Sequence, residues 1–458
     1  MKMEEELVNT FTRYRSNFKT KTRDSSAHGW TVLKGYLLLE TNRTYQNIDR
    51  KINGVNADGQ NIQQFMSDSP WSWEGVFNQV MVDIKSNPAL SGGTLNFDES
   101  GDQCSGPHKA GASRQYIGRA GKVELGQVGV LSSYSIDNLW LLTGAELFLP
   151  RKWFNQPQLR KKWKRLKIPL EREFATKVEI AISLFDKAID QNLPFKWVGG
   201  DALYGRSLSF RRHIADNGKY YMMCIPKDEH VWLSNPLTDE DKPVGKKVSE
   251  LVEQADFEPI MIRNAERGQL IYEQAFVPVW TVGKNKKAAK REARKELLVI
   301  RKEPDGSTSY ALTNASLAEV GKEEIAVQRA ERYFVERTIQ DCKSELGWDE
   351  LQALKYPAYM HSLAICAVAL IFLLNVKLKQ REKFDDPETV QEELGIERLP
   401  DISLANVKEL MRSVMPLPRL TRKEARKKIV QILFDRSKST ASRRRKQRKN
   451  QKEKNDTS

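Results

Sequence analysis

The sequence predicts an α/β fold in which a mixed β-sheet is flanked by helices. Three observations predict it. Strand-like runs follow one another between residues 92 and 150. After them, helical and strand-like patterns alternate up to residue 225, and two more helical patterns lie between residues 322 and 374. Strands followed by alternating helices and strands are typical of a sheet that carries helices on its faces.

Composition limits the classes of protein that this chain can represent. It has 458 residues, 40% of them hydrophobic and 29% charged, which is typical of a globular protein with several domains. The net charge of +15 favours a polyanionic partner, above all nucleic acid, because basic side chains displace counterions from phosphates. The four cysteines lie far apart and form no CxxC pair, which argues against a zinc finger or a disulfide framework.

The first 88 residues are predicted to form a helical N-terminal region, because apolar residues such as Phe65, Trp73 and Phe77 recur at helical spacing. This region is either a helix-turn-helix DNA reader or an ordinary helical bundle. The N-terminus lacks the apolar stretch of a signal peptide. The longest apolar run, residues 363–374, is too short to span a bilayer and predicts a buried core helix. We therefore expect an intracellular protein without a membrane segment.

Residues 89–225 are predicted to form the first part of an α/β core. Three runs predict antiparallel strands, namely "GGTLNFDESG", "KVELGQVGVLSSYSI" and "WLLTGAELFLP". The helix "EFATKVEIAISLFDKAIDQN", the strand "FKWVGG", the helix "SLSFRRHIADNG" and the strand "KYYMMCIP" follow. This is the order of elements in the RNase H-like fold.

The remaining chain divides into three predicted regions. Residues 226–315 hold several strand-like runs and the charged stretch "KNKKAAKREARKE", which predict a β-rich insertion. Residues 316–376 complete the core, with a long helix from about residue 322 to 346 and the apolar helix. Residues 377–458 form a charged helical C-terminal region. Its tail, "SRRRKQRKNQKEKNDTS", is predicted to be disordered until it contacts phosphate.

Two aspartates follow strand-like runs in this core. Asp98 is expected to end the first strand, and Asp201 to end the parallel strand beside it. Ligands of open α/β sheets bind at the carboxyl ends of strands, so the two side chains are placed to face each other across a metal pair. Hard divalent ions such as Mg²⁺ take oxygen ligands of this kind. The alternative is that each aspartate only caps the helix that follows it.

The predicted long helix adds a third acidic residue. At 100° per residue, Arg332, Glu336 and Lys343 fall within about 60° of one another, beside an apolar stripe. A carboxylate between two cations suits a site that holds metal and phosphate together. The alternative is a solvated charge pair on the helix surface.

Three blocks of the sequence resemble the catalytic blocks of DDE transposases from bacterial insertion sequences. They are "LNFDES", "WVGGDALYGRS" and "RYFVERTIQDCKSELG". The stretches "SRQYIGRAGKVELGQVGV", "ELFLPRKW" and "FATKVEIA" also match, so that the resemblance runs from about residue 63 to 372. It implies that Asp98, Asp201 and Glu336 are the catalytic residues and bind two Mg²⁺ ions, for which Mn²⁺ can substitute.

The helix block resembles the group with the signature Y-x2-R-x3-E-x6-K. Arg332, Glu336 and Lys343 match it, whereas Arg329 stands at the tyrosine position, where it could also contact phosphate. The group carries a β-rich insertion in which an aromatic residue can stack on a flipped base. Trp232 and Trp280 are candidates for that role, with packing in the core as the alternative.

Several basic residues are expected to contact DNA. Lys109 and Arg114 lie on what the resemblance implies is a basic loop beside the active site. Arg206 either reaches the scissile phosphate or pairs with a surface carboxylate. The run "RKKWKRLK" interleaves a tryptophan with cations and can serve as a phosphate track with a stacking platform. The residues expected at DNA are therefore Arg332, Lys343, Arg329, Lys109, Arg114, Arg206, Arg160, Lys161, Lys162 and Trp163.

These observations predict a metal-dependent DNA transposase. It would bind double-stranded DNA at the terminal inverted repeats, cleave it by two-metal hydrolysis and join the freed 3′-hydroxyl ends to target DNA. A hairpin intermediate is left open. Because two ends must be brought together, a homodimer is expected in the synaptic complex, in the bacterial cytoplasm at the nucleoid. The alternative is a catalytically inactive DNA-binding protein that retains the fold.

Overall fold

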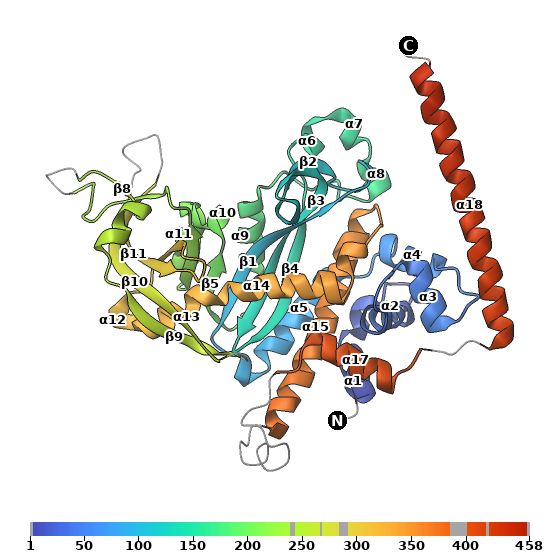
Figure 1. Cartoon of the computed structure of the whole chain (residues 1–458), viewed down its shortest axis with the longest axis horizontal. Coiled ribbons are helices and arrows are strands. Elements are labelled where there is room, and N and C mark those ends of the chain that lie inside the picture. The colour runs from blue at the N-terminus through green and yellow to red at the C-terminus, as the bar shows by residue number, and fades with distance from the viewer. Residues whose placement is uncertain are drawn as a thin grey trace.

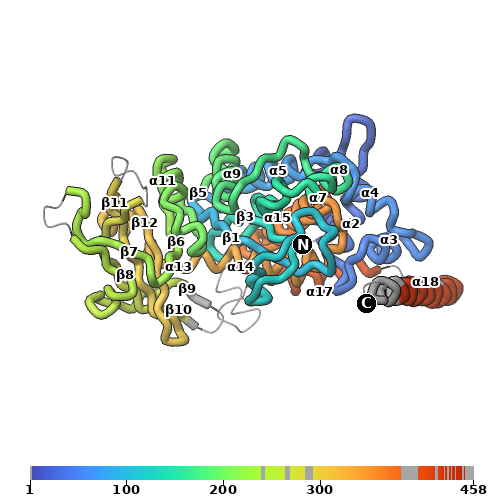
Figure 2. The backbone as a smooth tube through the Cα atoms, turned by 90° about the horizontal axis from the view of Figure 1, so that it is seen from above, coloured from blue at the N-terminus to red at the C-terminus, as the bar shows by residue number. Residues whose placement is uncertain are grey.

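The computed structural model describes residues 3–238, 243–265, 268–283, 292–384, 401–417 and 421–455. Figures 1 and 2 show the N-terminal helices beside one end of a central sheet and a group of β-strands at its other end. The C-terminal helix α18 stands apart from both in each view.

The N-terminal region is helical, as predicted. Its helices are α1 (Met3–Tyr14), α2 (Ser26–Leu38), α3 (Tyr45–Asn53), α4 (Gln60–Ser67) and α5 (Trp73–Lys85). Four of them, α1, α2, α4 and α5, pack against the long helix α15 (Tyr356–Phe384). By length and composition α15 could cross a membrane, but 94% of its most apolar window is buried inside the protein. It is therefore the core helix that the apolar run predicted, although it extends well beyond that run.

The central sheet is mixed, which confirms the predicted fold class. Strand β1 (Gly93–Gln103) pairs antiparallel with β3 (Lys122–Ile136) and parallel with β5 (Phe195–Gly200). Strand β6 (Tyr220–Ile225) continues the sheet parallel to β5, and β4 (Leu139–Phe148) pairs with β3. Helices α9 (Lys177–Asp190) and α11 (Leu208–Asp216) supply the connections around β5.

The β-rich stretch before the Glu336 helix extends this same sheet. Strand β12 pairs antiparallel with β6, and β11, β10 and β9 follow in that order. A buried ion pair, with the Arg211 Nε atom 2.9 Å from Oε1 of Glu296, connects helix α11 to strand β11. These strands are β9 (Glu258–Ala265), β10 (Gly268–Val282), β11 (Ala293–Lys302) and β12 (Thr308–Thr313). The proposed division of the chain into five regions stays a prediction.

Short elements connect these larger ones. They are β2 (Ser113–Ile117), α6 (Lys152–Asn155), α7 (Pro157–Arg160), α8 (Trp163–Leu166), α10 (Ala202–Gly205), β7 (His230–Val231), β8 (Lys246–Lys247), α12 (Leu317–Val320) and α17 (Leu404–Val414).

Three predictions about local structure were wrong. Strand β1 does not end at Asp98, because its pairing with β3 continues to Gln103. The helix predicted over residues 322–346 is divided into α13 (Lys322–Glu331), α14 (Tyr333–Gln340) and a π turn at Asp341–Glu345. Residues 442–455 of the C-terminal tail, which was predicted to be disordered, lie within the helix α18 (Arg422–Asn455), which is consistent with their lack of Gly and Pro.

Candidate active site

The register between β1 and β5 places the two predicted aspartates side by side. The last paired residues of these parallel strands are Phe97 and Gly200, and the next residue on each strand is an aspartate. Asp201 also caps α10, because its Oδ1 atom accepts a hydrogen bond from the backbone N–H of Leu203 at 2.9 Å. The sequence presents helix capping and a position at the strand end as alternatives for Asp201. The structure shows that this aspartate does both.

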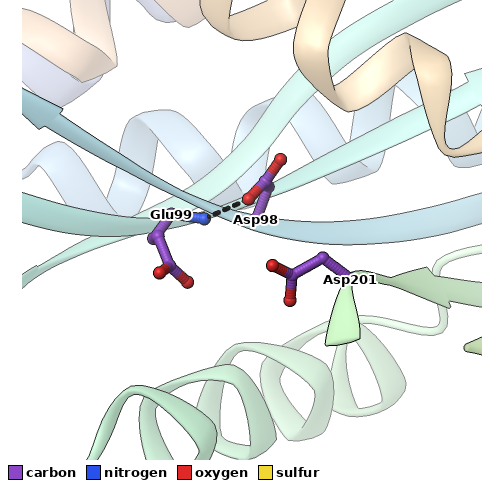
Figure 3. Close-up of side chains that lie close together, drawn as sticks. All are labelled: Asp98, Glu99 and Asp201. Carbon is purple, nitrogen blue, oxygen red and sulfur yellow. Dashed lines mark hydrogen bonds between the residues drawn. The ribbon is translucent and has the colours of Figure 1, made fainter. Parts of the chain in front are cut away.

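Asp98, Glu99 and Asp201 form a compact acidic cluster (Figure 3). One carboxylate oxygen from each lies within 4.8 Å of the others. Burial, followed by repulsion from Asp201, raises the pKa of Asp98 to about 7. Burial and the Glu99 carboxylate raise the pKa of Asp201 as well. A divalent cation would relieve this repulsion, and the donor set consists only of the hard oxygen atoms that such a cation prefers.

Glu99 was missed by the sequence analysis, although it is the residue after Asp98. Its carboxylate is already engaged: the Lys177 Nζ atom lies 2.9 Å from Oε1, and the Tyr204 hydroxyl donates to Oε2 at 3.4 Å. Figure 3 shows its side chain leaving the strand on the side away from Asp98. Because a cation and a hydroxyl already satisfy it, Glu99 is a weaker candidate for a metal ligand than either aspartate.

Glu336 is not a member of the compact cluster but is connected to it through Arg332. The Arg332 guanidinium lies 2.6 Å from Oε1 of Glu336 and 3.8 Å from Oδ2 of Asp98. The Glu336 side chain is 50% exposed. The arginine thus stands between two of the three predicted catalytic carboxylates, where its positive charge offsets theirs.

One face of strand β1 binds the segment that carries Glu336 through a series of polar contacts. Alternate residues of a strand point to the same face, so residues 94, 96, 98 and 102 form one row. Each contacts, directly or through one side chain, a residue progressively further along the chain from α13 to the π turn that follows α14. The contacts are Thr94–Gln328 (2.6 Å), Asn96–Ser135–Glu331 (3.1 and 2.8 Å), Asp98–Arg332 (3.8 Å) and Asp102–Lys343 (2.6 Å). These contacts set the position of the segment that carries Glu336 along strand β1.

Lys343 is buried instead of lying at a DNA surface, which corrects the expectation for this residue. It is 8% exposed, and its Nζ atom donates to Oδ1 of Asp102 at 2.6 Å and to the Gly101 carbonyl at 3.1 Å. The π turn explains the difference. The N–H of Leu346 bonds to the carbonyl of Asp341, five residues back, so the 100° rule fails before Lys343 is reached.

We predict that Lys343→Met destabilises the protein by about 2 kcal/mol, because it leaves the half-buried Asp102 carboxylate without its cation. The control is Lys196→Met, which removes a largely exposed pair with Glu324 and is expected to cost under about 1 kcal/mol. Urea unfolding of both variants measures the difference. If Lys343→Met keeps full stability but weakens DNA binding, the lysine serves DNA as the resemblance implies.

Arg329 is also buried, contrary to the expectation that it contacts DNA. It is 5% exposed, and its guanidinium donates to Ser309 Oγ at 2.9 Å and to Cys224 Sγ at 3.3 Å. It connects α13 to strands β12 and β6. The arginine at the signature's tyrosine position therefore has a structural environment in this chain.

Trp163 is a core residue and offers no stacking platform. It is 1% exposed, and its Nε1–H donates to the Trp153 carbonyl at 3.2 Å. The Arg160 guanidinium lies 3.6 Å from the centre of its ring and covers it. Lys161 is exposed and Lys162 is half-buried, so the basic part of the expected track is at the surface while the aromatic part is not.

The other residues expected at DNA lie at or near the surface with protein partners. Lys109 donates to the Leu351 carbonyl at 2.7 Å, and the exposed Arg114 donates to the Val123 carbonyl at 3.4 Å. Arg206 pairs with Asp228 at 3.1 Å, the surface pairing that was its alternative role.

The aromatic residues proposed for base stacking lie in the β-rich part of the sheet. The backbones of Trp232 and Trp280 pair with each other, and both side chains are half-buried. Most of the charged stretch between β10 and β11, residues 284–291, lies outside the described residues.

Comparison with known proteins identifies the class to which this fold and site belong. Residues 13–255 match the family described as DDE superfamily endonuclease, and residues 179–372 match the transposase DDE domain. Because the first match covers more than half of the chain, the chain belongs to the DDE superfamily of endonucleases, among the DDE-type transposases of insertion sequences. Members act on DNA in transposition and use divalent metal.

One curated relative carries a more particular description. It is the probable transposase for insertion sequence element IS701 from Microchaete diplosiphon. The two sequences are 22% identical over 315 residues, which make up 65% of this chain and 70% of the relative.

Proposed function

We propose that this protein cleaves DNA at the terminal inverted repeats of an insertion sequence and joins the freed 3′-hydroxyl ends to target DNA. The observation that carries this proposal is the strand register that brings Asp98 and Asp201 together at the end of the β1–β5 pairing. Two half-buried carboxylates held this close repel each other, which is costly unless a cation is bound between them.

Asp98, Asp201 and Glu336 would hold a pair of divalent ions, Mg²⁺ or Mn²⁺, and these ions would supply activation of a hydroxyl nucleophile and stabilisation of the leaving oxygen in phosphoryl transfer. The protein contributes the positions of its own groups. The polar row along β1 holds the Glu336 helix beside the two aspartates, and Arg332 neutralises part of the carboxylate charge. Arg332, directly before that helix and 3.8 Å from Oδ2 of Asp98, is also placed to bind a phosphate oxygen.

The proposal includes a homodimer in the complex that holds two DNA ends, since one active site is needed for each end. It also places the protein in the bacterial cytoplasm at the nucleoid. The net charge of +15 supports close association with DNA phosphates. A hairpin on the element end is compatible with the same three carboxylates.

The test uses a supercoiled plasmid that carries the element ends, incubated with the full chain and Mg²⁺. The protein is expected to nick the plasmid at the ends, and Asp201→Asn is expected to abolish nicking while DNA binding stays within about threefold. Asp190→Asn, an exposed aspartate at the end of α9, is the control and should cleave normally.

A second outcome would favour the alternative function. If the unmodified protein binds the ends tightly but does not nick them with Mg²⁺ or Mn²⁺, it is a DNA-binding protein that retains the fold. A protein that neither binds nor cuts the ends would contradict both functions.

A further inference from the structure

The C-terminal helix α18 carries most of the net charge of the protein. It spans Arg422–Asn455 and lies at the edge of the molecule, beyond the N-terminal helices (Figure 1). By sequence it contains 15 Lys and Arg residues and 3 Asp and Glu residues, so it contributes +12 of the total charge of +15. The remainder of the protein is therefore close to neutral.

The two halves of α18 differ in character. The first half exposes apolar side chains at Ile429, Val430, Leu433 and Phe434. The second half, residues 436–455, contains a single apolar residue, Ala441. Its described cations are all exposed, and none forms an ion pair with another residue that the structure describes. They are Arg436, Lys438, Arg443, Arg444, Arg445 and Arg448.

We propose that residues 436–455 form an arm that binds double-stranded DNA along its phosphate backbone, independently of base sequence. The inference rests on the proposed function in one respect, namely that the protein works on DNA. At 100° per residue, Arg443, Arg444 and Arg445 point in three different directions around the helix. A helix that lies in the major groove has phosphates on both sides, so cations around its circumference can reach both strands.

The length of the arm also fits duplex DNA. Twenty residues of α-helix span about 30 Å, which approaches the 34 Å of one turn of the double helix. Because the arm stands apart from the catalytic sheet, it would contact DNA at a distance from the cleaved bond. It would increase the affinity for flanking or target DNA without touching the reacting atoms.

An anionic membrane is the other polyanion that a basic helix can bind. Helices that lie on membranes bury an apolar face in the lipid, with cations on the opposite face. The second half of α18 lacks an apolar face, and its cations surround the helix. The observations therefore favour DNA over a lipid surface.

The experiment uses the full chain with Asp201→Asn, so that the DNA stays intact during binding. Arg443, Arg444, Arg445 and Arg448 are replaced together by Gln, and affinity for a random-sequence duplex is measured between about 50 and 200 mM KCl. Each lost phosphate contact lowers the slope of log Kd against log salt by about 0.9, so a decrease of about 3 to 4 is expected. The control replaces four exposed lysines elsewhere, Lys85, Lys187, Lys302 and Lys322, and is expected to change the slope by less than one.

Two results would overturn the inference. One is a salt slope equal to that of the parent protein, with circular dichroism showing that α18 is still folded. The other is normal DNA binding together with loss of binding to phosphatidylserine vesicles, which would assign the arm to a membrane. Failure of the proposed function appears separately, as an absence of cleavage by the protein with Asp201 intact.

Discussion

Glu336→Gln is expected to reduce cleavage of element ends by at least about a thousandfold, whereas Glu99→Gln is expected to reduce it by less than about tenfold. The acidic cluster by itself would suggest the opposite, because Glu99 lies within 4.8 Å of both aspartates and Glu336 does not belong to that cluster. The partners of the two carboxylates decide between them. Lys177 and Tyr204 already satisfy Glu99, while Glu336 is half-exposed and has Arg332 as its partner.

Both substitutions are isosteric, and the two variants should bind element-end DNA with similar affinity. Single-turnover cleavage in Mg²⁺ measures the effect, with gel-shift titration as the control for binding. If Glu99→Gln abolishes cleavage and Glu336→Gln leaves it near normal, the third acidic ligand is on strand β1, and the assignment of Glu336 is wrong.

Asp98→Asn is expected to abolish cleavage and at the same time to stabilise the metal-free protein above pH 7. The pKa of Asp98 is raised from 3.8 to about 7 in the folded chain. Between these values the folded state holds a proton that the unfolded state has released. The free energy of unfolding therefore falls as the pH rises from about 4 to about 7 and stays low above that.

The asparagine side chain cannot ionise, so the free energy of unfolding of the variant does not fall in this way as the pH rises. A shift of three pKa units corresponds to about 4 kcal/mol, and a gain on the order of 2 to 4 kcal/mol is expected at pH 8, with none at pH 4. Urea unfolding without metal at both pH values measures it. Addition of Mg²⁺ should stabilise the unmodified protein at pH 8 and leave Asp98→Asn unchanged. Equal stability of the two proteins at pH 8 would show that the aspartates are not held in the repelling arrangement.

The sequence was sufficient to predict the sheet and the pair of aspartates because local signals define both. The apolar run that ends at Asp201 is a strand that ends there, and "LNFDES" is a strand that contains Asp98. The continuation of β1 to Gln103 could not be predicted, because polar residues 100–103 are held in the strand by pairing with β3 and not by their own propensity.

The side chains on the Glu336 helix were harder to predict. A regular helix places Lys343 on the same face as Glu336, but the π turn at Asp341–Glu345 redirects it to Asp102. Burial of Arg329 and Trp163 likewise depends on strands and helices distant in sequence. A run of basic and aromatic residues has the same sequence pattern whether its side chains point outward or into the core. The charge pattern alone therefore did not distinguish residues that could contact DNA from residues of the core.

The most direct test of this account is a crystal structure of the full chain with bound Mn²⁺. The anomalous scattering of manganese locates the metal. We predict manganese bound by Asp98 and Asp201, with the Glu336 carboxylate turned from Arg332 to join them. Manganese bound by Asp98, Glu99 and Asp201, with Glu336 still paired to Arg332 and facing solvent, would contradict the assignment of the catalytic triad.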